Sequence, residues 1–232
     1  MPITDEQKEA IVNSYRVLDF RDKKTVWMIA NRGESLLPGI RGHILRVAYY
    51  TQLLVNEIYE RKLYKKIVTK EYVEMLPISA AIHDVGKLFL PKEIVNAPRK
   101  LTKQEYEIMK LHISYGNELI KKALESKENE KFLKLTQDVV TYHHERYDGN
   151  GYLLRLKGKK IPLSGRIVAI ADIYDAIKSA RTYKKALSQE ETIEYMKSVS
   201  GKDVDPELLE IFLSDNIQKQ IKEMLILKHL EE

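Results

Sequence analysis

Apolar residues recur at helical spacing along most of this chain. Intervals of three and four residues place side chains on one face of a helix. Two stretches show the pattern clearly, and their apolar positions are Ile44, Val47, Ala48 and Leu54 in the first and Val73, Leu76, Ala80 and Ile82 in the second. The sequence therefore predicts an all-α protein built as a bundle of amphipathic helices.

Capping residues mark where several of these helices begin. Residue pairs typical of capping boxes are Thr4 with Gln7, Thr102 with Glu105 and Ser188 with Glu191. Asp205 and Pro206 are typical of an N-cap followed by proline at the first helical position. The main irregular stretch is a glycine-rich segment around residues 147–165, for which we expect a loop or a short hairpin.

The chain is expected to contain two regions. Pro38 and Gly39 break the pattern, so residues 1–38 are predicted to be an N-terminal helical extension and residues 39–232 the main domain with C-terminal helices. One or two extra helices packed on the bundle are the expected structure of the extension. A dimerisation or partner-binding element is the alternative.

Composition limits the chemistry and the location. Cysteine is absent, so metal ligands must be nitrogen and oxygen donors, which favours iron or manganese over a thiolate zinc site. The net charge of +5 helps to attract an anion, but its dispersed lysines and arginines do not indicate a nucleic-acid polymer as partner. No apolar run reaches the roughly 18 residues of a membrane span, and Met1–Ala10 lacks the apolar part of a signal peptide. We expect a cytoplasmic protein without membrane contact.

Two histidine motifs carry the candidate chemistry. His143 and His144 are adjacent, and two neutral imidazoles need partners for both ring nitrogens, which a metal supplies and an apolar core does not. A partly exposed helix end without function is the alternative for this pair. His83, Asp84 and Lys87 place an imidazole, a carboxylate and an ammonium within about one helical turn. Such groups can build a two-metal centre for displacement at phosphorus.

These motifs, in this order, resemble the HD-GYP branch of the HD phosphohydrolase superfamily. The resemblance covers roughly residues 39–213 and includes the segments around Gly42-His43-x-x-Arg46, His83-Asp84-x-Gly86-Lys87, Leu111-His112, His143-His144-Glu145, Asp148-Gly-x-Gly151-Tyr152, Arg166 to Asp172, Tyr174-Asp175-Ala176, and Arg181 with Tyr183 and Lys184. It implies an HD-type helical bundle. Of the histidines, only His229 falls on no motif.

The resemblance implies a ligand set for two divalent transition-metal ions, most simply Fe or Mn. Asp84 would bridge the ions, with His43, His83 and Asp172 on one and His112, His143 and His144 on the other. Lys87 would neutralise a phosphate oxygen, so Lys87 and Asp84 are the expected catalytic residues. The expected substrate-binding residues are Tyr152, Asp175, Arg181 and Lys184. For Tyr152, Arg181 and Lys184 the alternative is a core aromatic and surface charges.

The implied activity is hydrolysis of cyclic di-GMP to linear pGpG, with GMP as the product of a second step. Two positions depart from the family pattern. Leu153 replaces the proline of the family name, which predicts a less rigid loop with altered partner contacts or substrate positioning. Gly39 stands where members with a third metal carry glutamate, so we expect two metals and a weaker second step.

Two further interpretations stay open. One is an HD phosphohydrolase for another nucleotide, such as cyclic GMP-AMP, and the other is a non-catalytic receptor or scaffold for cyclic di-GMP. The complete ligand set speaks against the receptor, because a site without catalysis has no evident reason to keep it. Expected partners are the cyclic dinucleotide, a diguanylate cyclase (GGDEF) domain or a sensor protein acting in trans, and a second copy of the chain in a homodimer.

Overall fold

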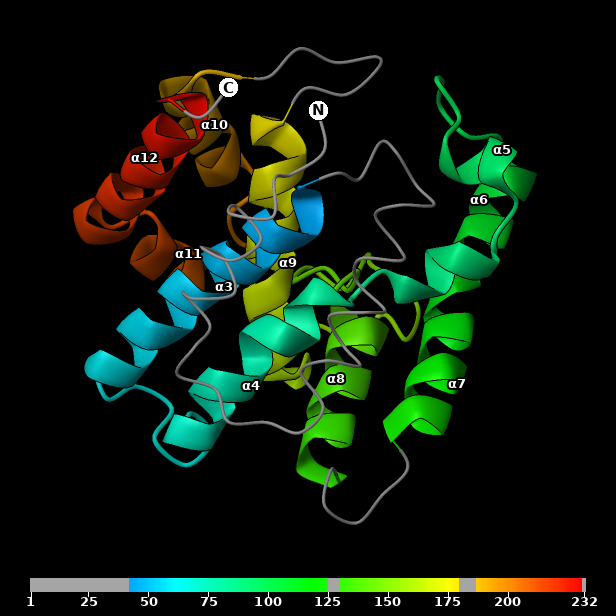
Figure 1. Ribbon diagram of the computed structural model, residues 1–232, viewed down its shortest axis with the longest axis horizontal. Coiled ribbons are helices and arrows are strands. Elements are labelled where there is room, and N and C mark those ends of the chain that lie inside the picture. Colours follow the sequence, from blue (N-terminus) through cyan, green and yellow to red (C-terminus); the bar gives the residue numbers. More distant parts are fainter. Residues whose placement is uncertain (1–41, 125–129, 180–186, 231–232) are drawn as a thin grey trace.

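The computed structural model describes residues 42–124, 130–179 and 187–230. Within these ranges the regular secondary structure is helical and contains no strand, which confirms the predicted all-α class (Figure 1). The central helices of the bundle are α3 (His43–Glu60), α4 (Lys70–Ala81), α7 (His112–Leu124), α8 (Glu130–Tyr142) and α9 (Leu163–Lys178). Shorter elements lie between them: η2 (Val85–Phe89), α5 (Lys92–Val95), α6 (Lys103–Lys110) and η4 (Gly158–Lys160).

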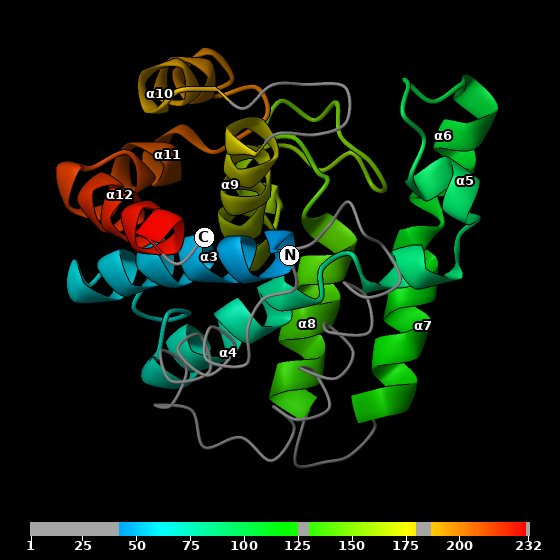
Figure 2. The same cartoon turned by 45° about the horizontal axis from the view of Figure 1, so that its top comes forward.

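The packing of the bundle brings distant segments together. Helix α3 packs against α4 and α9, and α8 contacts α4, α7 and α9. The last three helices are α10 (Gln189–Ser198), α11 (Pro206–Phe212) and α12 (Asp215–Leu230). They gather at one end of the molecule beside α3 and α9, away from α7 and α8 (Figure 2). The starts of α3 and α7, the ends of α4 and α8 and the middle of α9 converge on one region.

Aromatic packing joins three of these helices in the core. Tyr50 of α3, Tyr174 of α9 and Phe212 of α11 are fully buried. The ring centroid of Tyr174 lies 5.1 Å from that of Tyr50 and 5.1 Å from that of Phe212, and both pairs are edge-to-face. Such pairs contribute about 0.5 to 1.5 kcal/mol beyond the burial of their area. This core fixes the position of α3 against α9, on which part of the candidate site depends.

The predicted helix starts are confirmed wherever the structure describes them. Thr102 and Ser188 each form a capping box, with Glu105 and Glu191 respectively. Asp205 caps α11, and Pro206 is its first residue. The predicted capping box of Thr4 and the extension of residues 1–38 lie outside the described residues.

The glycine-rich segment is irregular, as expected, but ends slightly earlier than predicted. It contains the short η4 and no hairpin, and α9 already begins at Leu163. Gly165 thus lies in the first turn of α9, where a Cβ atom would stand 2.7 Å from Cβ of Tyr142 at the end of α8. Glycine here allows close contact between two helices. No helix among the described residues is both long and apolar enough to cross a membrane.

Candidate metal centre

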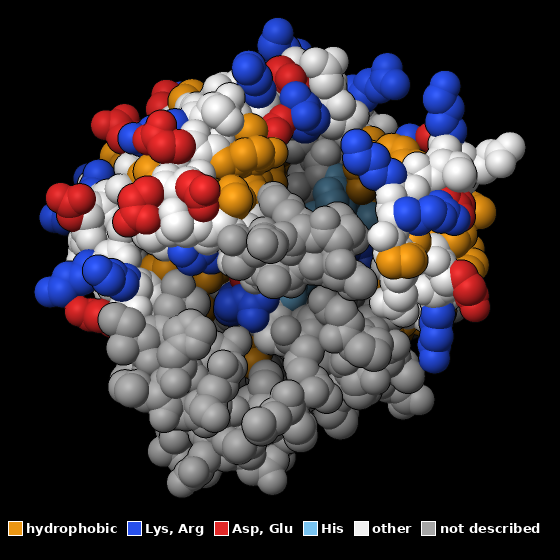
Figure 3. Space-filling view, turned by 90° about the horizontal axis from the view of Figure 1, so that it is seen from above, with side chains coloured by type: hydrophobic (Ala, Val, Ile, Leu, Met, Phe, Trp, Pro, Cys, Tyr) orange, Lys and Arg blue, Asp and Glu red, His pale blue; other side chains and the backbone are white. Residues whose placement is uncertain are grey.

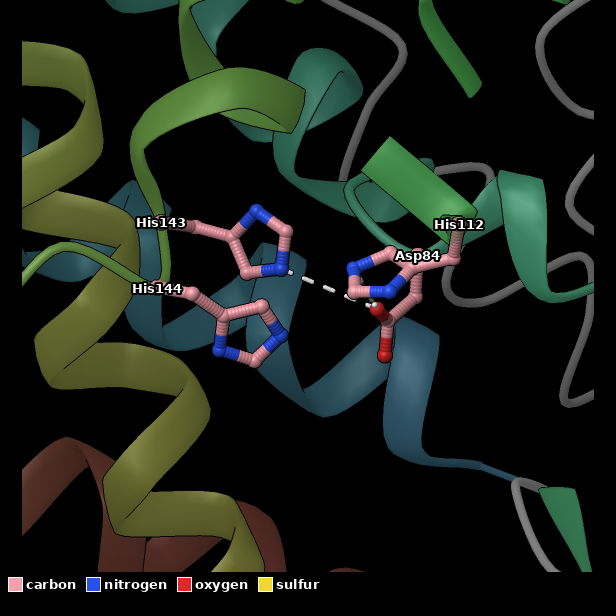
Figure 4. Close-up of side chains that lie close together, drawn as sticks. All are labelled: Asp84, His112, His143 and His144. Carbon is pink, nitrogen blue, oxygen red and sulfur yellow. Dashed lines mark ion pairs between the residues drawn. The ribbon is translucent and has the colours of Figure 1, made fainter. Parts of the chain in front are cut away.

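The residues predicted as metal ligands come from separate parts of the sequence and meet in the region where the helices converge. His43 opens α3, His83 and Asp84 lie in the turn between α4 and η2, His112 opens α7, His143 and His144 follow α8, and Asp172 lies on α9. Figure 4 shows four of them, with His112, His143 and His144 gathered around Asp84. Figure 3 shows histidine side chains within a hollow of the surface, with lysine and arginine side chains along part of its edge.

The end of α8 explains how two adjacent histidines serve one site. Neighbouring residues inside a helix point about 100° apart, since each turn holds about 3.6 residues. Helix α8 ends at Tyr142, and His143 and His144 lie in the turn that follows. Their ring centroids are 4.0 Å apart, and that of His144 is also 5.2 Å from that of His112. The helix end therefore allows both rings to face the centre.

Several buried polar atoms at the centre have no hydrogen-bond partner. They are Nε2 of His83, His112 and His143, and Oδ1 of Asp84. Oδ1 of Asp84 lies 3.3 Å from Nε2 of His112 and 3.6 Å from Nε2 of His143. Unpaired buried polar atoms are costly, and nitrogen and oxygen lone pairs facing one another repel unless a cation lies between them. The donor set thus fits metal ions well.

The opposite ring nitrogens hold these imidazoles in the orientation that a metal needs. Nδ1 of His83, His112 and His143 each lies 2.7 to 3.0 Å from a backbone carbonyl oxygen about one turn earlier in the chain. A carbonyl oxygen only accepts, so Nδ1 carries a proton, and in the neutral ring Nε2 holds the lone pair that can bind a cation. Metal-binding histidines generally have such an outer partner.

The candidate ligands form two groups that share Asp84. One group consists of Asp84, His112, His143 and His144, and the other of His43, His83 and Asp84; within each, the ligand atoms lie within 4.8 Å of one another. Asp172 adjoins the second group, because its Oδ1 is 3.5 Å from Nε2 of His43 and 3.7 Å from Nε2 of His83. This geometry agrees with the predicted division, although the ligand roles themselves stay a prediction.

The two groups differ electrostatically. Burial alone would lower the pKa of His83, but the carboxylates of Asp84 and Asp172 raise it to about 9. Burial lowers the pKa of His112 to about 4 and that of His144 well below its usual value. Burial would raise the pKa of Asp84, but the Lys87 ammonium and His83 hold it well below its ordinary value. Asp84 is therefore ionised and can accept on both oxygens.

Lys87 and Tyr152 lie beside these groups. The Lys87 ammonium contacts Oδ2 of Asp84 and is partly exposed. The Tyr152 ring stacks on His144 with centroids 4.8 Å apart, and it forms an edge-to-face pair with Tyr106 with centroids 5.7 Å apart. Lys110 lies over both tyrosine rings, 4.9 Å from the centroid of Tyr106 and 5.7 Å from that of Tyr152. The sequence alone did not single out Tyr106 or Lys110, since no motif includes them.

Glu145 organises the loop that carries Tyr152, a role that sequence reasoning missed. Its side chain is buried, and Oε1 accepts from the backbone N–H groups of Leu154 at 2.6 Å and Arg155 at 3.1 Å, while Oε2 accepts from Leu156 at 2.9 Å. The sequence does contain a signal for this role, because Glu145 directly follows His144 and a carboxyl side chain in that place needs hydrogen-bond partners. Leu153 is exposed within this loop.

We expect Glu145→Gln to lower the free energy of unfolding by about 1.5 to 3 kcal/mol, the range for hydrogen bonds to a charged group. A glutamine turns one acceptor into a donor that faces backbone N–H groups. Urea denaturation measures the change. Glu194→Gln is the control, because Glu194 is exposed on α10 and its ion pair with Lys197 should contribute little. Equal stability of both variants would contradict the assigned role of Glu145.

The remaining residues predicted to bind substrate are Asp175, Arg181 and Lys184, and the structure describes only the first of them. Asp175 is buried, and its carboxylate accepts from His43 and Arg46. Burial would raise its pKa, but the hydrogen bonds from His43 and Arg46 lower it below the ordinary value. Arg181 and Lys184, like Gly39, lie outside the described residues. The substrate contacts predicted for Asp175 and these two cations stay predictions.

Comparison with known proteins identifies the family. The model of the HD domain family matches residues 51–208. A cyclic di-GMP phosphodiesterase of Vibrio cholerae is 38% identical over 172 residues, which are 74% of this chain and 35% of that protein. A 3'3'-cGAMP-specific phosphodiesterase of the same organism is 33% identical over 199 residues, 85% of this chain and 36% of the relative.

A third relative is a cyclic di-GMP phosphodiesterase of Thermotoga maritima, 38% identical over 157 residues, which are 68% of this chain and 41% of the relative. The chain thus spans between 35% and 41% of the length of these relatives. The family match covers more than half of the chain and includes most of the candidate ligands. This chain therefore belongs to the HD domain family, and its resemblance to the HD-GYP branch of that family is confirmed.

Proposed function

We propose that this chain is a metal-dependent phosphodiesterase that hydrolyses cyclic di-GMP to linear pGpG. The observation that carries the proposal is the set of buried, unpaired imidazole nitrogens that face the ionised carboxylate of Asp84. A centre of this kind suits an anionic substrate that brings its own oxygen atoms to the cations. The names of the relatives in Vibrio cholerae and Thermotoga maritima support a cyclic dinucleotide as the substrate class.

The proposed centre holds two ions of Fe or Mn. Asp84 is shared, His43, His83 and Asp172 hold one ion, and His112, His143 and His144 hold the other. Bound divalent ions of this kind polarise phosphoryl oxygens and lower the pKa of water. The protein contributes orientation, since the carbonyl-bound rings of His83, His112 and His143 need no rearrangement to present Nε2.

Lys87 would act on the substrate directly. Its ammonium is already beside Asp84 and partly exposed, so it can contact a non-bridging phosphate oxygen that reaches the centre. Charge on that oxygen grows as phosphorus becomes five-coordinate, and a fixed cation then stabilises it more than in the ground state. Tyr152, Arg181 and Lys184 complete the proposal as residues that bind the base and the second phosphate.

We expect Lys87→Ala to lower kcat by about 10²- to 10³-fold while KM changes little, as for loss of one fixed electrostatic contact in the transition state. Steady-state kinetics at saturating Mn(II) measure both constants, and metal analysis of the same sample shows whether the ions are retained. Lys92→Ala, a change of an exposed lysine on α5, is the control. A rise in KM with unchanged kcat would make Lys87 a binding residue only.

A second substrate is supported by a specific observation. The cGAMP-specific relative aligns with more of this chain than the first cyclic di-GMP relative does. The decisive experiment therefore presents cyclic di-GMP, 3'3'-cyclic GMP-AMP and cyclic di-AMP to the protein with Fe(II) or Mn(II) under anaerobic conditions and separates the products. Faster turnover of cyclic GMP-AMP would replace the proposed substrate. Tight binding without any product would favour the receptor interpretation.

The proposal also covers the product, the location, the regulation and the assembly of the protein. Hydrolysis that stops at pGpG is expected, with GMP formed slowly if at all. We also propose a cytoplasmic location and a homodimer, and the HD-GYP resemblance suggests regulation in trans by a sensor protein or a diguanylate cyclase domain. Residues 1–38 are proposed as a helical extension of the domain formed by residues 39–232.

A further inference from the structure

His43 differs from the other oriented imidazoles of the centre in its outer partner. Nδ1 of His83, His112 and His143 donates to a neutral backbone carbonyl oxygen. Nδ1 of His43 lies 2.7 Å from Oδ2 of Asp175, which is a carboxylate oxygen. Both kinds of partner leave Nε2 free to bind a cation, but a carboxylate also makes the ring a stronger electron donor.

Asp175 is itself held in place by a cation. Nε of Arg46 lies 2.5 Å from Oδ1 of Asp175, and Nη2 lies 3.0 Å from Oδ2. Nη2 of Arg46 also donates to Oγ of Ser179 at 2.9 Å. Asp175 is only 1% exposed, and a buried carboxylate without such a partner would be costly. Arg46 therefore contacts and fixes both oxygens of Asp175.

The spacing of these residues connects two helices at the centre. Arg46 follows His43 by three residues on α3, and Asp175 follows Asp172 by three residues on α9, so each pair shares one face of its helix. His43 touches the other helix through both nitrogens: Nε2 lies 3.5 Å from Asp172 and Nδ1 lies 2.7 Å from Asp175. Displacement of Asp175 would therefore act on one half of the centre.

We propose that Asp175, held by Arg46, is a positioning residue for His43 and raises the cation affinity of the half formed by His43, His83 and Asp172. The other half, formed by His112, His143 and His144, does not depend on Asp175. The inference rests on the metal centre of the proposed function, and it makes no use of the substrate or of turnover. It assigns Asp175 a role distinct from the substrate contact predicted from the sequence.

The experiment titrates the metal-free full chain with Mn(II) and follows both binding steps by calorimetry and electron paramagnetic resonance. Asp175→Asn keeps the shape of the side chain but removes its charge. We expect this variant to bind one Mn(II) about 10- to 100-fold more weakly, the usual cost of losing an outer partner, and the other with unchanged affinity. The resonance signal of coupled ions should give way to that of a single ion at intermediate Mn(II).

Variants that lack a ligand in one half of the centre make the test specific, because they report the binding of Mn(II) to the other half. In His112→Gln, the remaining binding reports the His43 half, and Asp175→Asn should weaken it by the same factor. In His43→Gln, Asp175→Asn should have no further effect, because its influence passes through the missing ring. Asp205→Asn is the structural control: it disturbs another buried pair, formed with Arg166 near the start of α9, and should leave Mn(II) affinity unchanged.

Several outcomes would overturn the proposal. Asp175→Asn could weaken the binding of both Mn(II) ions equally, or weaken the binding of neither. Its effect could also persist in the His43→Gln background. If Asp175→Asn does not fold, Arg46→Lys provides the same comparison, since it keeps the charge but loses the two-point contact. Absence of Mn(II) binding in the unchanged chain would overturn the metal centre as well. Normal binding without turnover would overturn the proposed function alone.

Discussion

Asp84→Ala should remove metal from both halves of the centre and lower turnover by at least about 10³-fold, equivalent to about 4 kcal/mol in the activation barrier. Asp84 is the one residue common to both groups of candidate ligands. Without its carboxylate, two cations would face each other across a set of neutral imidazoles, and their repulsion would be unscreened in a buried site. No other ligand change should affect both halves equally.

Elemental analysis of the purified variant and kinetics with added Mn(II) measure this effect. Asp138→Ala is the matched control, because Asp138 is a half-buried carboxylate of α8 whose charged neighbour is Lys134. The control should retain both metal content and turnover. Two ions per chain in Asp84→Ala would show that Asp84 is not the shared ligand. Loss of one ion only would assign Asp84 to a single half.

Gly86→Ala should unfold or strongly destabilise the protein, with a loss of about 3 kcal/mol or more in the free energy of unfolding. A Cβ atom at position 86 would stand 1.8 Å from the carbonyl oxygen of His112 and 2.6 Å from the backbone nitrogen of Gly116. These are backbone atoms of α7, which cannot rotate away. Helix α7 would have to move, and His112 would move with it.

Urea denaturation and Mn(II) titration together test this prediction. Gly116→Ala is the control on the opposite side of the same contact, where the nearest atom is Cγ1 of Val140 at 3.0 Å. A side chain can yield there, and alanine gains about 1 kcal/mol over glycine inside a helix, so the net change should be small. A Gly86→Ala variant as stable as Gly116→Ala would mean that η2 and α7 are less closely packed.

The centre contains one contact between neighbours in the sequence and one between distant residues, and only the first could be predicted. Lys87 and Asp84 could be predicted as a pair, because they lie three residues apart in one turn of chain. Arg46 and Asp175 each lie in a segment that resembles the family, yet their contact joins residues 129 positions apart and depends on the packing of α3 against α9. No local spacing indicates such a pair, since the tertiary fold alone sets which faces of two helices meet.

By itself, the sequence determined the helical class, the capped helix starts that the structure describes, and the residue types of the centre. These follow from local physics: apolar periodicity, capping hydrogen bonds, and the chemistry of imidazole and carboxylate groups. The tertiary structure alone decided that α9 begins before Gly165, that Glu145 accepts hydrogen bonds from the loop of Tyr152, and that His43 is hydrogen-bonded to Asp175. Each of these depends on how closely two distant backbone segments approach, and that distance results from the packing of the whole core.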